Sequence, residues 1–175
     1  TQTKKRLFDK EKSEYTFRSL NSLINSINLA KNSFNKINFE LVIIDYESSN
    51  KDLENIKKIL IKANFKNTII NLNINEFVNN IKNTNAKNEK VTDNQKSNMS
   101  NIHKSLLYAK DHSNDLVYFV EDDYLHKKES IMEMILTYER LSSQIKRELI
   151  ICPTDYPYLY TKADPTNVFL GYNKH

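Results

Sequence analysis

Acidic side chains close two apolar stretches of the chain, and these side chains are the ones best suited to chemistry. Asp45 ends the run FELVIID (39–45), and Glu121, Asp122 and Asp123 directly follow the run DLVYFV. Neighbouring carboxylates repel one another and lose hydration when they are partly buried. A bound Mg²⁺ or Mn²⁺ ion would remove that cost, because these ions prefer carboxylate, water and phosphate oxygens.

Two interpretations of the triplet Glu121–Asp123 are open. The acids could form a solvated turn that caps a helix predicted over 128–146. Alternatively they could bind a metal ion, with one or two carboxylates and a substrate diphosphate completing its shell. Ligands of open α/β sheets bind outside the carboxyl ends of the strands. The position of the triplet directly after an apolar run therefore favours the metal site.

The elements that must position these acids alternate along the chain. Apolar residues at helical spacing, such as Leu20, Leu23 and Ile27, predict helices, and short apolar runs ended by polar residues predict strands. Strand–helix alternation predicts an α/β fold with a mostly parallel sheet, helices on both faces and right-handed crossovers. The predicted helices cover 13–34, 51–63, 99–111 and 128–146, and the predicted strands cover 39–45, 67–74, 115–121 and 148–152.

Composition limits what the chain can do. Its 175 residues suffice for a single domain. One Gly excludes a Gly-rich phosphate loop, and a net charge of +4 gives no indication of nucleic-acid binding. The one cysteine, Cys152, and the absence of a signal peptide or membrane-spanning run indicate the cytoplasm. Residues 79–98 are almost wholly polar and predict a mobile loop.

Four sequence segments resemble, in the same order, elements of glycosyltransferases with the GT-A fold. LVYFVEDDYLH resembles their strand followed by the DxD motif, and its Glu-Asp-Asp form is similar to that of N-acetylglucosaminyltransferases. LVIIDYESSN resembles the V-V-D-D-G-S-T-D element of family 2. SNIHKSLLYAK resembles the A-x-N-x-G-L-x-x-A helix, and TQTKKR resembles the P-T-Y-N-R that ends the first GT-A strand.

The resemblance implies a Rossmann-like GT-A nucleotide-diphospho-sugar transferase fold, one domain over 1–175 that is truncated at both ends. It implies transfer of a hexosyl or N-acetylhexosaminyl group from a UDP- or GDP-sugar to a glycan or other hydroxyl acceptor, assisted by Mn²⁺ or Mg²⁺. Two alternatives are a non-catalytic nucleotide-sugar-binding module and a sugar-phosphate nucleotidyltransferase. The nucleotidyltransferases normally carry an N-terminal Gly-rich signature, which this chain lacks.

The resemblance also assigns roles to individual residues. Asp45 would hydrogen-bond the nucleotide base or ribose, and Asp123 would bind the metal. Glu121 and Asp122 would contact the ribose or the waters around the metal. Other expected nucleotide-sugar contacts depart from the family pattern, because Glu47 stands where the family has Gly and His103 stands where it has Asn. The remaining expected contact is Ser48, next to Glu47.

An inverting enzyme also needs a carboxylate base for the acceptor hydroxyl. Asp155, in the segment CPTDYPYLY (152–160), is the nearest candidate, although the segment also fits a structural turn with packed tyrosines, and the base could lie beyond residue 175. If most of the first GT-A strand is missing, the strand containing Ile43 should have an open edge or an improvised partner. In that case, residues 1–175 alone should bind nucleotide weakly and transfer no sugar.

Overall fold

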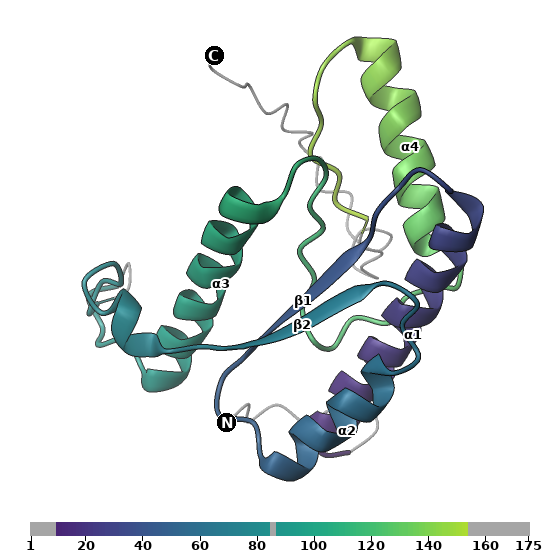
Figure 1. Cartoon of the computed structure of the whole chain (residues 1–175). Coiled ribbons are helices and arrows are strands. Elements are labelled where there is room, and N and C mark those ends of the chain that lie inside the picture. Colours follow the sequence, from purple (N-terminus) through teal and green to yellow (C-terminus); the bar gives the residue numbers. More distant parts are fainter. Residues whose placement is uncertain (1–9, 85–86, 154–175) are drawn as a thin grey trace, which may run out of the picture.

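The computed structural model describes residues 10–84 and 87–153, which form a mixed α/β structure (Figure 1). The helices match the apolar periodicity of the sequence to within a few residues, except for an earlier start of the third. In chain order the elements are α1 (Lys12–Ser33), β1 (Glu40–Asp45), α2 (Asn50–Leu60), β2 (Lys66–Asn71), the 3₁₀ helix η1 (Ile74–Phe77), α3 (Asp93–His112) and α4 (Ser130–Ile145).

β1 and β2 form a two-stranded parallel sheet, in register from Glu40 opposite Lys66 to Asp45 opposite Asn71. Helix α2 connects them, as a parallel pair requires, because the chain must cross back to the same end of the sheet. The parallel pairing and the mixed α/β class are therefore as predicted. A sheet of this size does not by itself define a Rossmann-like GT-A fold.

Helices lie on both sides of the sheet: α1, α2 and α4 on one side and α3 on the other (Figure 1). Successive strand residues point to opposite faces, and β1 follows this rule. Leu41 and Ile43 pack against the core formed by α1, α2 and α4. Ile44 instead packs with Leu72 and Phe77.

The predicted strands 115–121 and 148–152 are not strands in the structure, and these two predictions are wrong. Within the described residues, neither segment makes a backbone hydrogen bond to the sheet. Leu116 to Phe119 are exposed, and only Val120 of this run packs against the core. An apolar, β-branched composition favours a strand, but a strand also needs a partner edge, which local sequence does not supply.

The predicted loop 79–98 is shorter than expected, because α3 begins at Asp93. Thr92 and Gln95 form a capping box, in which each side chain bonds the other residue's backbone N–H. The pattern T-x-x-Q is a known signal of a helix start, and the polar composition of the segment obscured it. Val91, just before the cap, is buried.

Among the described residues, no helix combines the length and the apolar character that crossing a membrane would require.

Candidate functional site

Asp45 lies at the carboxyl end of β1 and is only 8% exposed. Its backbone carbonyl accepts a hydrogen bond from Leu72 N (2.7 Å), which continues the sheet beyond the ladder. Its carboxylate Oδ2 accepts from Ser48 N at 3.4 Å. The side chain therefore faces the turn between β1 and α2, the place at which ligands bind in parallel α/β units.

The turn after Asp45 has an unusual backbone. Glu47 adopts φ +55°, in the left-handed region that is uncommon for residues other than Gly. Ser49 then caps α2 by accepting from Asp52 N (3.1 Å). The buried carboxylate thus lies just before a helix N-terminus. The pKa of the neighbouring Tyr46 phenol is raised, first by partial desolvation and then by the Glu47 charge.

The acidic triplet Glu121, Asp122 and Asp123 is exposed and lies against α1. Asp122 Oδ2 accepts a hydrogen bond from Thr16 Oγ1 (3.0 Å) and lies 3.5 Å from Lys12 Nζ. The carboxylates of Glu121 and Asp123 make no hydrogen bond or ion pair with any described residue. Of the three acids, only Asp122 is thus committed to another element of the protein.

The structure does not join the triplet to Asp45. In the described part of the chain, the two share no hydrogen bond or ion pair, and the partner of the triplet is α1. The reason is that the segment 115–121, which was predicted as a strand, does not pair with the sheet. A segment that is not paired in the sheet does not bring its last residues to the carboxyl edge of that sheet.

Helix α3 carries the remaining predicted contact, His103, and one residue that sequence reasoning missed. The His103 ring is half-buried, with its centroid 5.1 Å from that of Phe77. Asn101 Nδ2 donates to the Ile44 carbonyl (3.0 Å), directly before Asp45. Asn101 lies two residues before His103, in the segment that resembles the A-x-N-x-G-L-x-x-A helix. That resemblance was the signal by which Asn101 could have been found. Asp155 lies outside the described residues.

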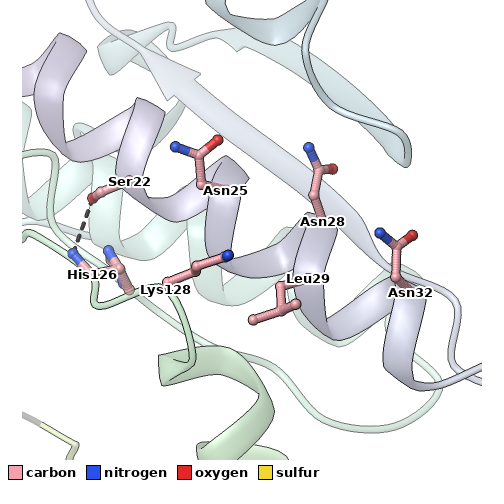
Figure 2. Close-up of a pocket in the computed structure, with 7 residues that line it drawn as sticks. All are labelled: Ser22, Asn25, Asn28, Leu29, Asn32, His126 and Lys128. Atoms are coloured by element: carbon pink, nitrogen blue, oxygen red, sulfur yellow. Dashed lines mark hydrogen bonds between the residues drawn. The ribbon is translucent and has the colours of Figure 1, made fainter.

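A groove of about 500 Å³ lies between α1 and the segment that follows the triplet (Figure 2). The His126 ring lines this groove: Nε2 lies 3.0 Å from the Tyr118 hydroxyl, and Nδ1 is buried with no hydrogen-bond partner among the described residues. Burial lowers the pKa of this imidazole. The groove is lined by Ser22, Asn25, Asn28, Leu29, Asn32, His126 and Lys128.

Several hydrogen-bonding atoms of the side chains that line the groove are already bonded to other groups of the protein. Asn28 Nδ2 donates to the Lys62 carbonyl (2.8 Å), and Asn28 Oδ1 accepts from Asn64 N (3.1 Å). Asn32 Oδ1 accepts from Asn64 Nδ2 (3.4 Å). These bonds hold α1 to the connection between α2 and β2. The two amides therefore serve packing rather than a ligand.

The exposed carboxylates provide the hard oxygen atoms that Mg²⁺ and Mn²⁺ prefer. Among the described residues, however, no three or more His, Cys, Asp or Glu side chains gather where they could hold a metal ion. The donor set therefore suits an ion that takes one or two protein carboxylates and fills its shell with water and phosphate oxygens.

The fold and site thus define a small parallel α/β unit with a buried carboxylate at a strand end and an exposed acidic triplet that lies against helix α1. No protein-family model, curated protein or solved structure matches the chain.

Proposed function

We propose that the chain is a nucleotide-diphospho-sugar transferase domain. It would move a hexosyl or N-acetylhexosaminyl group from a UDP- or GDP-sugar to a hydroxyl acceptor in the cytoplasm, with the help of Mn²⁺ or Mg²⁺. The proposal rests on the resemblance of four ordered segments to GT-A enzymes, together with the place of Asp45 in the fold.

The observation that carries the proposal is the buried carboxylate of Asp45. Burying a charge is costly unless hydrogen bonds compensate for it. The only partner of this carboxylate among the described residues is Ser48 N, at the long distance of 3.4 Å. Asp45 therefore keeps acceptor capacity that the N–H of a base or the O–H of a ribose could fill.

The triplet would act on the diphosphate half of the donor. Asp123 would hold the metal ion, because its carboxylate has no other partner among the described residues. When bound, the ion would neutralise charge on the departing nucleoside diphosphate. Asp122 would keep its bond to α1, and Glu121 would contact the ribose or the waters around the ion.

Calorimetric titration of UDP, GDP, CDP and dTDP, each with and without Mn²⁺, tests the proposal. We expect binding of UDP or GDP that requires the ion, and a loss of that binding in Asp45→Asn and Asp123→Asn. Asp111→Asn is the matched control, because Asp111 is an exposed acid at the end of α3. Wild-type protein that binds no nucleotide with Mn²⁺ would refute the proposal.

A thermal-shift experiment measures the same binding independently. Nucleotide at 100 times its dissociation constant stabilises the folded chain by about 2.7 kcal/mol. The stabilisation should disappear in Asp45→Asn, whereas the unfolding midpoint of the free variant should stay close to that of the wild type. If Asp45→Asn instead destabilises the free protein by a similar amount, Asp45 acts in folding rather than in nucleotide binding.

The non-catalytic module remains the second candidate, because no residue of the sequence matches the catalytic base of the GT-A enzymes securely. Both candidates bind the metal–nucleotide complex, so binding does not separate them. Mn²⁺-dependent hydrolysis of UDP-glucose, UDP-N-acetylglucosamine or a GDP-sugar does. Turnover that is absent from Asp123→Asn indicates the transferase, and binding without turnover indicates the module.

A further inference from the structure

A row of hydroxyl side chains on α1 receives the segment that carries the acidic triplet. Thr16, Ser19, Ser22 and Ser26, here called the hydroxyl row, follow one another at spacings of three or four residues and therefore share a helix face. Each of them hydrogen-bonds a residue between 122 and 131. That segment runs from the acidic triplet into the first turn of α4 and includes no strand.

Two members of the hydroxyl row flank Asp123. Thr16 Oγ1 donates to Asp122 Oδ2 (3.0 Å), on one side of it. Ser19 Oγ donates to the Tyr124 carbonyl (2.6 Å), on the other side. Ser19 is 3% exposed, so little water competes for its hydroxyl. The Asp122 side chain is thus held immediately before Asp123, and the backbone is held immediately after it.

The rest of the row fixes the chain further along. Ser22 Oγ accepts from His126 N (3.0 Å), as Figure 2 shows. Ser26 Oγ, which is fully buried, accepts from Ile131 N (3.0 Å) in the first turn of α4. The segment is held at successive turns of one rigid helix. A bond broken at one turn therefore leaves the other anchors in place.

None of these bonds uses the Asp123 carboxylate, which has no hydrogen bond or ion pair with a described residue. Its backbone is restrained while its oxygens stay available, the arrangement that lets a side chain bind an ion with little loss of conformational freedom. We infer that Thr16 and Ser19 are positioning residues that hold Asp123 ready for a metal–nucleotide ligand. The inference rests on the proposed function in one respect only, which is that Asp123 binds the metal ion.

The test uses the whole chain and the double variant Thr16→Val, Ser19→Ala. Amide hydrogen exchange over 121–126 is measured without ligand, and calorimetry gives the Kd for UDP with Mn²⁺. We expect faster exchange in that segment and a Kd raised about 10- to 100-fold, the usual effect of removing a residue that orients a metal ligand. Thr16→Ser, which retains the hydroxyl, should restore much of the affinity that Thr16→Val loses.

Ser33→Ala is the matched control, because the Ser33 hydroxyl bonds only the Leu29 carbonyl within α1. It should change neither measurement. Unchanged exchange in the double variant would overturn the inference whether or not nucleotide binds. Faster exchange with an unchanged Kd would overturn the positioning role. Faster exchange in a protein whose wild type binds no Mn²⁺–nucleotide would uphold the anchoring and overturn the proposed function.

Discussion

At the residue scale, Lys12 and Asp122 form an exposed pair in which the lysine charge acts on the whole acidic triplet. The two side chains are 67% and 51% exposed, so the pair adds little to stability. The ammonium nevertheless opposes a divalent cation bound at the triplet. A unit charge and a divalent ion about 8 Å apart in water interact by about 1 kcal/mol, or roughly fivefold in affinity.

Lys12→Met should therefore tighten Mn²⁺–UDP binding by no more than about fivefold, with the difference shrinking as salt is added. Calorimetry at two ionic strengths measures both effects. Lys10→Met is the control, because Lys10 is exposed, lies two residues before α1 and does not pair with Asp122. Weaker binding in Lys12→Met would mean that Lys12 contacts the nucleotide phosphates instead.

Tyr138 on α4 donates a hydrogen bond to Glu148, and this bond above all raises the pKa of the phenol to about 12. Because the folded protein favours the neutral phenol, the interaction stabilises the fold fully below pH 10. That contribution is lost as the pH rises from about 10 to about 12. The pair is partly exposed, so we expect Tyr138→Phe to cost only about 0.5 kcal/mol at pH 7.

Urea unfolding of the wild type and Tyr138→Phe at pH 7 and at pH 11.5 checks this linkage, and ultraviolet titration follows the phenol directly. The two proteins should differ at pH 7 and converge at pH 11.5. Glu148→Gln serves as the companion variant, since it keeps an acceptor but removes the charge. A difference that grows with pH would show that the sign of the linkage is wrong.

The site shows the limit of local reasoning most clearly. The buried place of Asp45 at a strand end could be predicted, because the acid is the last residue of the run FELVIID. The partner of the triplet could not be predicted. It depends on α1 lying against a segment about 105 residues away, and nothing in the spacing of Thr16 and Ser19 names Asp122 or Tyr124.

At the element scale, α1, α2 and α4 could be predicted because each buries one apolar face. For α4 the predicted range 128–146 compares with the observed Ser130–Ile145. The strand at 39–45 and the start of the strand at 67–74 were also close to β1 and β2. The runs 115–121 and 148–152 are similarly apolar, but they do not pair with the sheet in the described structure, so their strand propensity is not realised.

Helix α4 is capped by another element. Its own N-cap residue, Glu129, makes no side-chain cap bond, and Ser26 of α1 satisfies the Ile131 N–H instead. Ser26→Ala would leave that donor unpaired in a fully buried position, which costs about 1–3 kcal/mol. Sequence rules for caps look only at the residues next to a helix, so they do not detect this contact.

Urea unfolding measures the cost of Ser26→Ala. Ser33→Ala is again the control, because Ser33 is exposed and bonds only its own helix; it should change the free energy of unfolding by less than about 0.5 kcal/mol. Equal effects of the two substitutions would show that Ser26 does not cap α4.

At the scale of the whole molecule, the sheet ends at β1 within the described residues. The Asp45 carbonyl bonds β2, so the carbonyl of Ile44 points to the other edge. There Asn101 from α3 binds it, and no described strand pairs with this edge. The open edge expected for the strand containing Ile43 is therefore present in the described structure. An unpaired edge is a template for association with another chain.

The run Leu116–Phe119 is a further exposed apolar surface, with Leu116 at 49% and Phe119 at 52% exposure. Exposed apolar patches and free strand edges both promote association. We therefore expect the chain to bind the dye ANS and to self-associate as its concentration rises, as followed by sedimentation velocity. The double variant Val117→Lys, Phe119→Lys should reduce both, because charges break the patch.

Asn79→Lys, Asn80→Lys adds the same charge at two other exposed positions and should change neither if the patch is the cause. An equal reduction in the two double variants would instead assign the effect to net charge.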